Sequence, residues 1–170
     1  MILTTHAIAG AAIAQFFPAH PVLAFGAGFV SHFLLDTIPH WDYTLRSSKK
    51  DEQNPLSVDM EVGKDFFVDL VKIGFDIMLG VFASAFILGF VFGVPITTAA
   101  WLGMFGGMLP DFLQFAYMKW RREPLLSLQK FHHWIHSEKK LKQYPFSGIL
   151  LQTLLVAVVV LASRLLLPVL

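Results

Sequence analysis

A set of histidine and aspartate side chains is spread along the chain in a pattern that could hold metal ions. Imidazole nitrogens and carboxylate oxygens are the ligands of catalytic zinc sites, and they also suit manganese and iron. The chain has no cysteine, which excludes thiolate sites. Because one zinc ion takes about three protein ligands plus water, a set of this size predicts about two or three divalent ions, with zinc as the expected metal. The predicted ligands are His6, His32, Asp36, His40, Asp42, Asp76, Asp111, His132, His133 and His136.

Helical spacing aligns several of these residues on common faces. Side chains four residues apart lie one above the other on a helix, so His32 and Asp36 share a face. His132 and His136 share a face for the same reason. These pairs are therefore expected to point in one direction from their helices.

Paired metal ions would give the carboxylates a role in phosphoester cleavage. Two ions about 3.5–4 Å apart, bridged by a carboxylate, clamp the attacking and departing oxygens of a phosphoester displacement. Asp36, Asp76 and Asp111 are the candidates for this carboxylate, which could also act as the general base. Lys72 is available to hold a phosphate oxygen, unless it forms a structural pair with Asp69 or Asp76.

Composition indicates the elements that must position these residues. Of 170 residues, 55% are hydrophobic and 15% are charged, and the mean hydropathy is +0.61. Soluble domains average about 25% charged residues, so the surplus of apolar residues predicts a membrane protein. Apolar runs near the length of about 20 residues that crosses a bilayer predict one all-α domain, residues 1–170, with about five transmembrane helices. The predicted spans are Ile2–Phe17, Val22–Ile38, Phe66–Phe92, Ile96–Met118 and Phe146–Leu167.

The charged residues predict the orientation of this bundle. Lysine and arginine concentrate in Trp41–Asp65 and Lys119–Tyr144, and loops rich in these residues stay on the cytoplasmic side. We therefore expect a multi-pass protein of the inner (cytoplasmic) membrane with a cytoplasmic N-terminus. Within the second stretch, the pattern of Ser127–Glu138 predicts a short amphipathic helix on the cytoplasmic face. The formal net charge of +1 does not call for nucleic acid as a partner.

With this topology, nearly all the predicted ligands fall at the cytoplasmic ends of the spans. An ionisable residue within a span is costly, and it is a candidate functional group by default. A site at this depth lies at the level of the lipid headgroups. Membrane lipids are therefore the expected partners, and an amphiphilic phosphoester is the expected substrate.

Four short segments resemble a family of bacterial and archaeal inner-membrane metal-dependent hydrolases, itself thought to be distantly similar to zinc-dependent phospholipase C and P1-type nuclease. The segments are Thr5–His6 with Gly10, His32-xxx-Asp36-xx-Pro39–His40–Trp41–Asp42, Leu109–Pro110–Asp111, and His132–His133-xx-His136–Ser137. The resemblance implies an all-helical fold, a multinuclear zinc-type site and phosphoester hydrolysis. The matching ligands are His6, His32, Asp36, Asp111, His133 and His136. The chain departs from the family where Pro-Asp-x-Asp is reduced to Pro110–Asp111, followed by Phe112 and Leu113.

The sequence therefore predicts a membrane-embedded metal-dependent hydrolase that cleaves a phosphoester of a lipid or lipid-linked substrate at the cytoplasmic face. A divalent-metal or proton transporter is the first alternative, because it would use the same histidines and aspartates as a pathway. The outer halves of the predicted spans carry few ionisable residues, which counts against such a pathway. The second alternative is a non-enzymatic membrane scaffold, in which the histidine–aspartate pairs only join helices.

Overall fold

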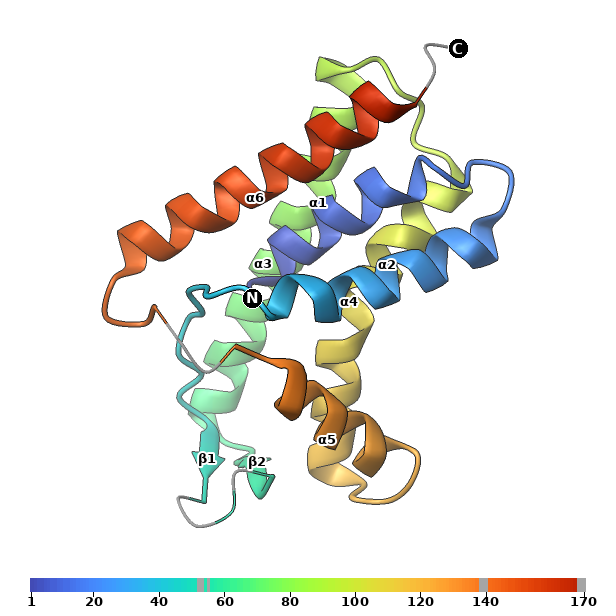
Figure 1. The fold of residues 1–170 in the computed structure, drawn as a ribbon. Coiled ribbons are helices and arrows are strands. Elements are labelled where there is room, and N and C mark those ends of the chain that lie inside the picture. The colour runs from blue at the N-terminus through green and yellow to red at the C-terminus, as the bar shows by residue number, and fades with distance from the viewer. Residues whose placement is uncertain (52–53, 55, 138–140, 168–170) are drawn as a thin grey trace.

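A computed structural model describes residues 1–51, 54, 56–137 and 141–167 of the chain. They form an all-helical bundle with one small β-hairpin (Figure 1). The predicted all-α class is confirmed at this level. In chain order the elements are α1 (Leu3–Ala14), α2 (Pro21–Asp36), β1 (Ser48–Lys50), β2 (Val58–Met60), α3 (Lys64–Ala85), the π-helix η1 (Phe86–Val91), α4 (Thr98–Lys119), α5 (Leu125–Ile135) and α6 (Pro145–Leu166).

Helix α1 lies at the centre of the bundle and contacts α2, α3, α4 and α6. Its side chains are mostly small and buried, with alanines and a glycine along most of its length. Small side chains let helix backbones approach closely. A Cβ atom added at Gly103 of α4 would lie 2.5 Å from the carbonyl oxygen of Gly10 and 2.6 Å from the Cβ of Ala14. The contact between α1 and α4 therefore depends on glycine.

Two helices in the described residues are long and apolar enough to cross a membrane, namely the continuous segment Lys64–Val91 and α6. The prediction of about five spans was wrong. Helices α1 and α2 have 12 and 16 residues, so they extend over roughly 18 Å and 24 Å, less than a hydrocarbon layer of about 30 Å. Helix α4 has 22 residues and is long enough to cross a membrane. However, Asp111, Gln114 and its glycines lower its mean hydropathy, and it is not one of the two helices that are apolar enough to do so.

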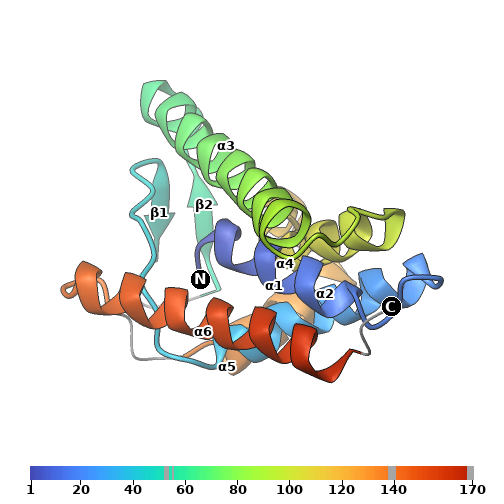
Figure 2. The ribbon, with the colours of Figure 1, turned by 90° about the horizontal axis from the view of Figure 1, so that it is seen from above.

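The two long apolar helices lie on opposite flanks of α1 (Figure 2). Only 22% of the most apolar stretch of Lys64–Val91 is buried inside the protein, and the corresponding share for α6 is 17%. The core helix of a soluble protein is mostly buried. The apolar faces of α3 and α6 are therefore open on the outside of the bundle.

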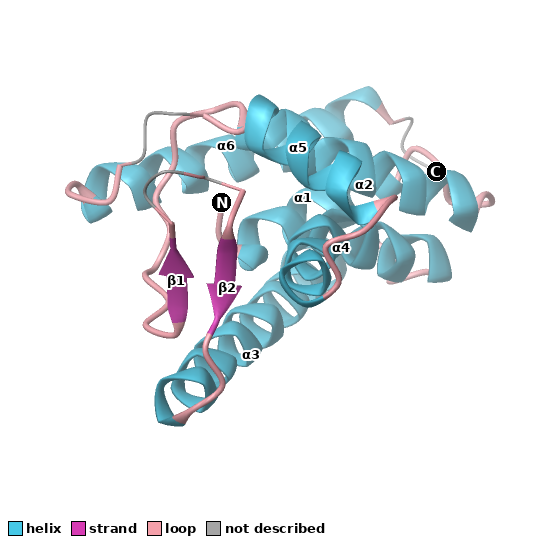
Figure 3. Ribbon diagram, turned by 90° about the horizontal axis from the view of Figure 1, so that it is seen from below, coloured by secondary structure: helices cyan, strands magenta, loops and turns pink. Residues whose placement is uncertain are grey.

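The polar stretch between α2 and α3 contains a hairpin that the sequence pattern did not predict. Strands β1 and β2 pair antiparallel, with Ser48 opposite Met60. The hairpin lies beside the first turns of α3 (Figure 3) and is bound to the end of α4. Lys119 donates to Asp59 Oδ1 at 2.6 Å and to the carbonyl of Met60 at 2.8 Å, and Arg121 donates to the carbonyl of Val58 at 3.2 Å.

Candidate metal centre

Asp36, the last residue of α2, lies at the centre of a cluster of histidines. Its side chain is fully buried. Oxygen Oδ2 lies 3.2 Å from Nε2 of His32 and 3.1 Å from Nε2 of His132, and Oδ1 lies 3.3 Å from Nε2 of His6. Two more imidazoles are farther out, with Nε2 of His40 at 3.9 Å and Nε2 of His136 at 3.8 Å. The structure thus brings together groups from α1, α2, α5 and the segment after α2.

Glycines one helical turn from the ligands let α1, α2 and α4 approach closely enough for this. The pairs are Gly10 with His6, Gly28 with His32, and Gly107 with Asp111. A Cβ atom added at Gly28 would lie 3.1 Å from the backbone nitrogen of Gly107. Because the backbones are this close, side chains one turn away on different helices reach one another.

Three imidazoles are oriented by backbone carbonyls so that Nε2 faces the cluster. A carbonyl oxygen only accepts hydrogen bonds, so the Nδ1 atom that contacts it carries the proton. In a neutral ring Nε2 then has a free lone pair, and this arrangement orients histidine ligands in metal sites. The acceptors are the carbonyls of Gly107 for His32 at 2.8 Å, of Ile38 for His40 at 2.7 Å, and of Ser137 for His136 at 3.2 Å.

Three buried imidazole nitrogens have no hydrogen-bond partner among the described residues, whereas Nε2 of His32 and Nε2 of His132 lie within hydrogen-bond distance of each other at 3.3 Å. Both ring nitrogens of His6 and Nε2 of His40 are buried without a hydrogen-bond partner among the described residues. Buried polar atoms are normally paired, since leaving one unpaired is costly. A cation among these nitrogens and carboxylates would supply the missing partner.

The spacing of the donor atoms fits a tetrahedral zinc site. With zinc–ligand distances of about 2.0 Å, neighbouring ligand atoms of one ion lie about 3.3 Å apart. Oδ2 of Asp36, Nε2 of His32 and Nε2 of His132 lie 3.1–3.3 Å from one another, and Nε2 of His6 lies on the other side, 3.3 Å from Oδ1. Four groups of three residues have ligand atoms within 4.8 Å of one another. They are His6–His32–Asp36, His32–Asp111–His132, Asp36–His132–His136 and His40–Asp42–His136.

These overlapping groups can be divided between two ions. One imidazole nitrogen can bind one ion at a time, so each histidine that faces the cluster through Nε2 can serve one ion. The groups His32–Asp111–His132 and His40–Asp42–His136 share no residue. Asp36 lies between the two groups, with Oδ1 3.9 Å from Nε2 of His40 and Oδ2 3.1 Å from Nε2 of His132. The donor set thus contains two separate groups, each of which could hold a metal ion.

Charges around Asp42 keep this carboxyl in its anionic form. The α-amino group of Met1 lies 3.3 Å from Oδ1 of Asp42 and 2.9 Å from Oδ1 of Asp36. Burial by itself would raise the pKa of Asp42, but the positive charge of the Met1 ammonium helps to hold that pKa below its usual range. Burial lowers the pKa of His136 to about 4, so this imidazole is neutral at pH 7. Both side chains therefore have the protonation state that metal binding requires.

Three predicted site residues lie outside this cluster. The carboxylate of Asp76 caps the start of α1, accepting hydrogen bonds from the backbone nitrogens of Leu3 at 2.7 Å and Thr4 at 3.0 Å. Lys72 donates to Asp69 Oδ1 at 3.1 Å and so forms the structural pair that was the alternative to phosphate binding. His133 is exposed and belongs to none of the four metal-competent groups in the described residues.

Two glutamines near the site were not predicted, and one of them holds a segment that carries ligands. Gln152 of α6 donates to the carbonyl of Trp41 at 2.9 Å and so holds the segment that carries His40 and Asp42. Gln129 of α5 is buried beside the site, one turn before His132. The sequence did contain a signal for each of them. Gln152 is a polar residue within an apolar helix, and Gln129 lies three residues before the predicted ligand His132. Predicted helix Ser127–Glu138 is observed as α5, Leu125–Ile135, and Glu138 lies outside the described residues.

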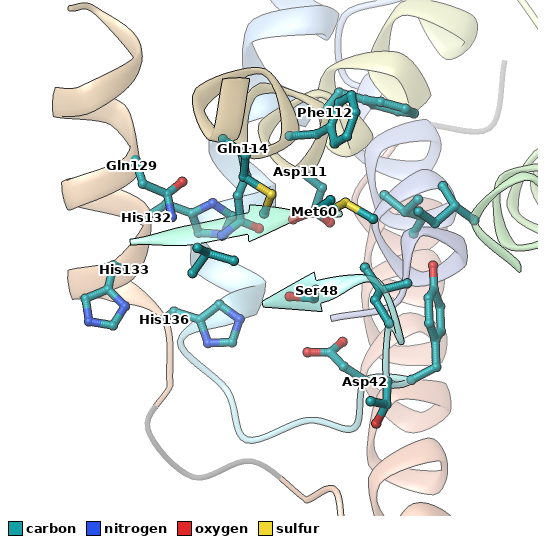
Figure 4. Close-up of a pocket in the computed structure, with 18 of the residues that line it drawn as sticks. Asp42, Ser48, Met60, Asp111, Phe112, Gln114, Gln129, His132, His133 and His136 are labelled. Carbon is teal, nitrogen blue, oxygen red and sulfur yellow. The ribbon is translucent and has the colours of Figure 1, made fainter. Parts of the chain in front are cut away.

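A cavity of about 1260 Å³ opens beside the cluster. Metal-competent side chains on its wall include Asp42, Asp111, His132 and His136. Figure 4 shows the carboxylate of Asp42 pointing toward His136, while Asp111 lies near His132. The candidate centre is therefore open to a ligand rather than sealed inside the bundle.

The fold and the cluster define an all-helical protein with a buried histidine–aspartate centre and two exposed apolar helices. Comparison of the chain with family models, with curated proteins and with solved structures finds no match.

Proposed function

We propose that the protein is a metal-dependent hydrolase of the inner membrane, which cleaves a phosphoester of a lipid or lipid-linked substrate at the cytoplasmic face. The observation that carries the proposal is the set of Nε2 lone pairs that face Asp36. Backbone carbonyls hold His32, His40 and His136 in this orientation, and Nε2 of His40 is buried with no hydrogen-bond partner in the part of the chain that the structure describes. The resemblance of the short motifs to inner-membrane metal-dependent hydrolases agrees with this choice.

The donor chemistry supports zinc or a similar divalent ion. Histidine and carboxylate without thiolate is the ligand set of catalytic zinc, and manganese and iron use it as well. When bound, such ions supply Lewis acidity to a phosphoryl oxygen and activate water for attack. His32, Asp111 and His132 would hold one ion, and His40, Asp42 and His136 would hold another.

The chain's own side chains would then bind and orient the substrate. Asp36 holds the cluster together from its centre and is the candidate general base. Asp111 is 29% exposed and lines the cavity, so it can contact a substrate directly. Asp76 and Lys72 keep their capping and pairing roles and have no part in the proposed chemistry.

Membrane location is part of the proposal. The segment Lys64–Val91 and α6 expose apolar surface that lipid would cover. Because basic residues concentrate in 41–65 and 119–144, the positive-inside rule assigns these stretches and the N-terminus to the cytoplasm. This orientation requires α4, which lies between them in the chain, to cross the membrane inside the bundle with its polar residues facing the other helices. Alkaline phosphatase or green fluorescent protein fused at residue 167 would report which side of the membrane the end of α6 occupies.

Metal analysis of the protein purified in detergent without chelator is the first experiment. We expect about two transition-metal ions per chain, and less than one tightly held ion would overturn the proposal. A panel of chromogenic phosphomonoesters, phosphodiesters and phospholipids should then show turnover that chelation abolishes and zinc restores. Zinc uptake by proteoliposomes, with no turnover of any substrate, would instead identify a transporter.

A further inference from the structure

One wall of the cavity beside the metal centre is apolar. Phe66, Leu70 and Ile73 of α3 line it at spacings of four and three residues, and they therefore form one stripe on that helix. Phe112 and Phe115 of α4 line it as well. We call these five residues the apolar wall.

The apolar wall and the metal centre belong to the same cavity. Asp111 and Phe115 lie one turn apart on α4, so a metal-competent carboxylate and the wall share a helix face. The rings of Phe66 and Phe115 stack with centroids 6.2 Å apart, which joins α3 to α4. Figure 4 shows Phe112 and Met60 beside Asp111. A ligand bound at the centre therefore has apolar surface within one helical turn.

The size of the cavity points to a ligand larger than a phosphate headgroup. Its volume is about 1260 Å³, above the roughly 300–1,000 Å³ of ordinary small-molecule sites. Leu70 is 52% exposed, and it belongs to the segment Lys64–Val91, whose outer face is apolar. The wall thus continues onto the surface that lipid would cover, and the hydrocarbon part of a membrane molecule can reach the cavity from there.

We infer that the apolar wall is the binding subsite for the hydrocarbon chain of a membrane amphiphile whose phosphate lies at the metal centre. This inference rests on the proposed function, because the metal centre supplies the site for the phosphate. The single cavity accounts for both halves of such a molecule. The apolar wall would bind the hydrocarbon chain of the ligand, and the metal centre would bind its phosphate.

Binding of alkyl phosphonates, which resist hydrolysis, tests the subsite. Butyl phosphonate and dodecyl phosphonate are titrated into zinc-loaded protein in lipid nanodiscs by calorimetry, with empty nanodiscs subtracted. Each methylene that the wall buries should tighten binding by about fourfold, so the dodecyl compound should bind at least about 100-fold tighter than the butyl compound. Equal affinity for the two compounds would overturn the inference.

Variants of α3 test where the hydrocarbon chain of the ligand binds. Leu70→Asn should weaken dodecyl phosphonate binding by about tenfold and leave butyl phosphonate binding and zinc content unchanged. The matched control is Val71→Asn, since Val71 is 73% exposed on the same helix and does not line the cavity. Equal losses in both variants would overturn the assignment. Failure of the proposed function would look different, because neither phosphonate would then depend on zinc.

Discussion

Replacing Asp36 with asparagine should greatly weaken metal binding while preserving the shape of the site. The two side chains have nearly the same volume, but asparagine lacks the negative charge and one acceptor oxygen. Asp36 lies close to histidines of the groups His32–Asp111–His132 and His40–Asp42–His136, so binding at each group should weaken. Removing a partner that only supports a metal ligand costs about 10–100-fold in affinity. For the central carboxylate we expect a loss of about 100-fold or more.

The size of this effect follows from linkage between binding and unfolding. At a free zinc concentration 100 times the wild-type Kd, binding adds about 2.7 kcal/mol to the free energy of unfolding. A variant with a Kd about 100-fold higher gains only about 0.4 kcal/mol at the same zinc concentration. Thermal unfolding with and without zinc measures this difference within each variant, so any change in metal-free stability cancels.

The matched control is Asp69→Asn. Asp69 is also a fully buried aspartate, but it binds Ser47 and Lys72 away from the cluster. This variant should keep its zinc content and its stabilisation by zinc. The reasoning is refuted if Asp36→Asn retains the wild-type gain, or if Asp69→Asn loses zinc to the same extent.

Three further predictions concern the fold around the site. Asp76→Ala should lower the free energy of unfolding by about 2 kcal/mol, because the first amides of α1 lose their cap, while the zinc content measured by mass spectrometry stays unchanged. Gly103→Ala should lower the free energy of unfolding by about 2 kcal/mol or more, because the new methyl group clashes with α1. The control is Gly74→Ala, where nothing lies within 4 Å of the new Cβ; in denaturant unfolding its free energy should stay within about 1 kcal/mol of wild type. In chelator, the protein should lose stability as the pH falls from about 6.5 to about 4, because His136 takes up a proton in the unfolded chain before it does so in the folded one. His136→Gln should show a shallower decline over this range in thermal unfolding, and an unchanged slope would contradict the assigned pKa.

Local spacing predicted those features of the site that depend on a single helix. The pairs His32–Asp36 and His132–His136 share helix faces as their spacing of four residues requires, and both pairs reach the cluster. The same spacing favours His132 over His133, whereas the family resemblance selected His133. In the structure His132 contacts Asp36 and His133 is exposed.

The number of membrane spans was predicted less well, because composition does not show where a helix ends. The apolar residues of α1 were counted toward a span, yet they are small and buried against four neighbouring helices. A buried core helix and a lipid-facing helix have similar hydropathy. Only the packing shows which apolar residues face inward and which, as on α3 and α6, remain exposed.

By itself the sequence determined the helical class, the nitrogen and oxygen donors of any metal site, and the face on which each donor stands. Tertiary structure decided which donors meet. Nε2 of His32 and Nε2 of His132 lie 3.3 Å apart although 100 residues separate them, and Asp76, which has the same chemistry as Asp36, caps α1 instead. The physical reason is that a face is set by the local helical repeat. Contact between faces depends on how closely distant backbones pack, which here is decided by glycines in three helices.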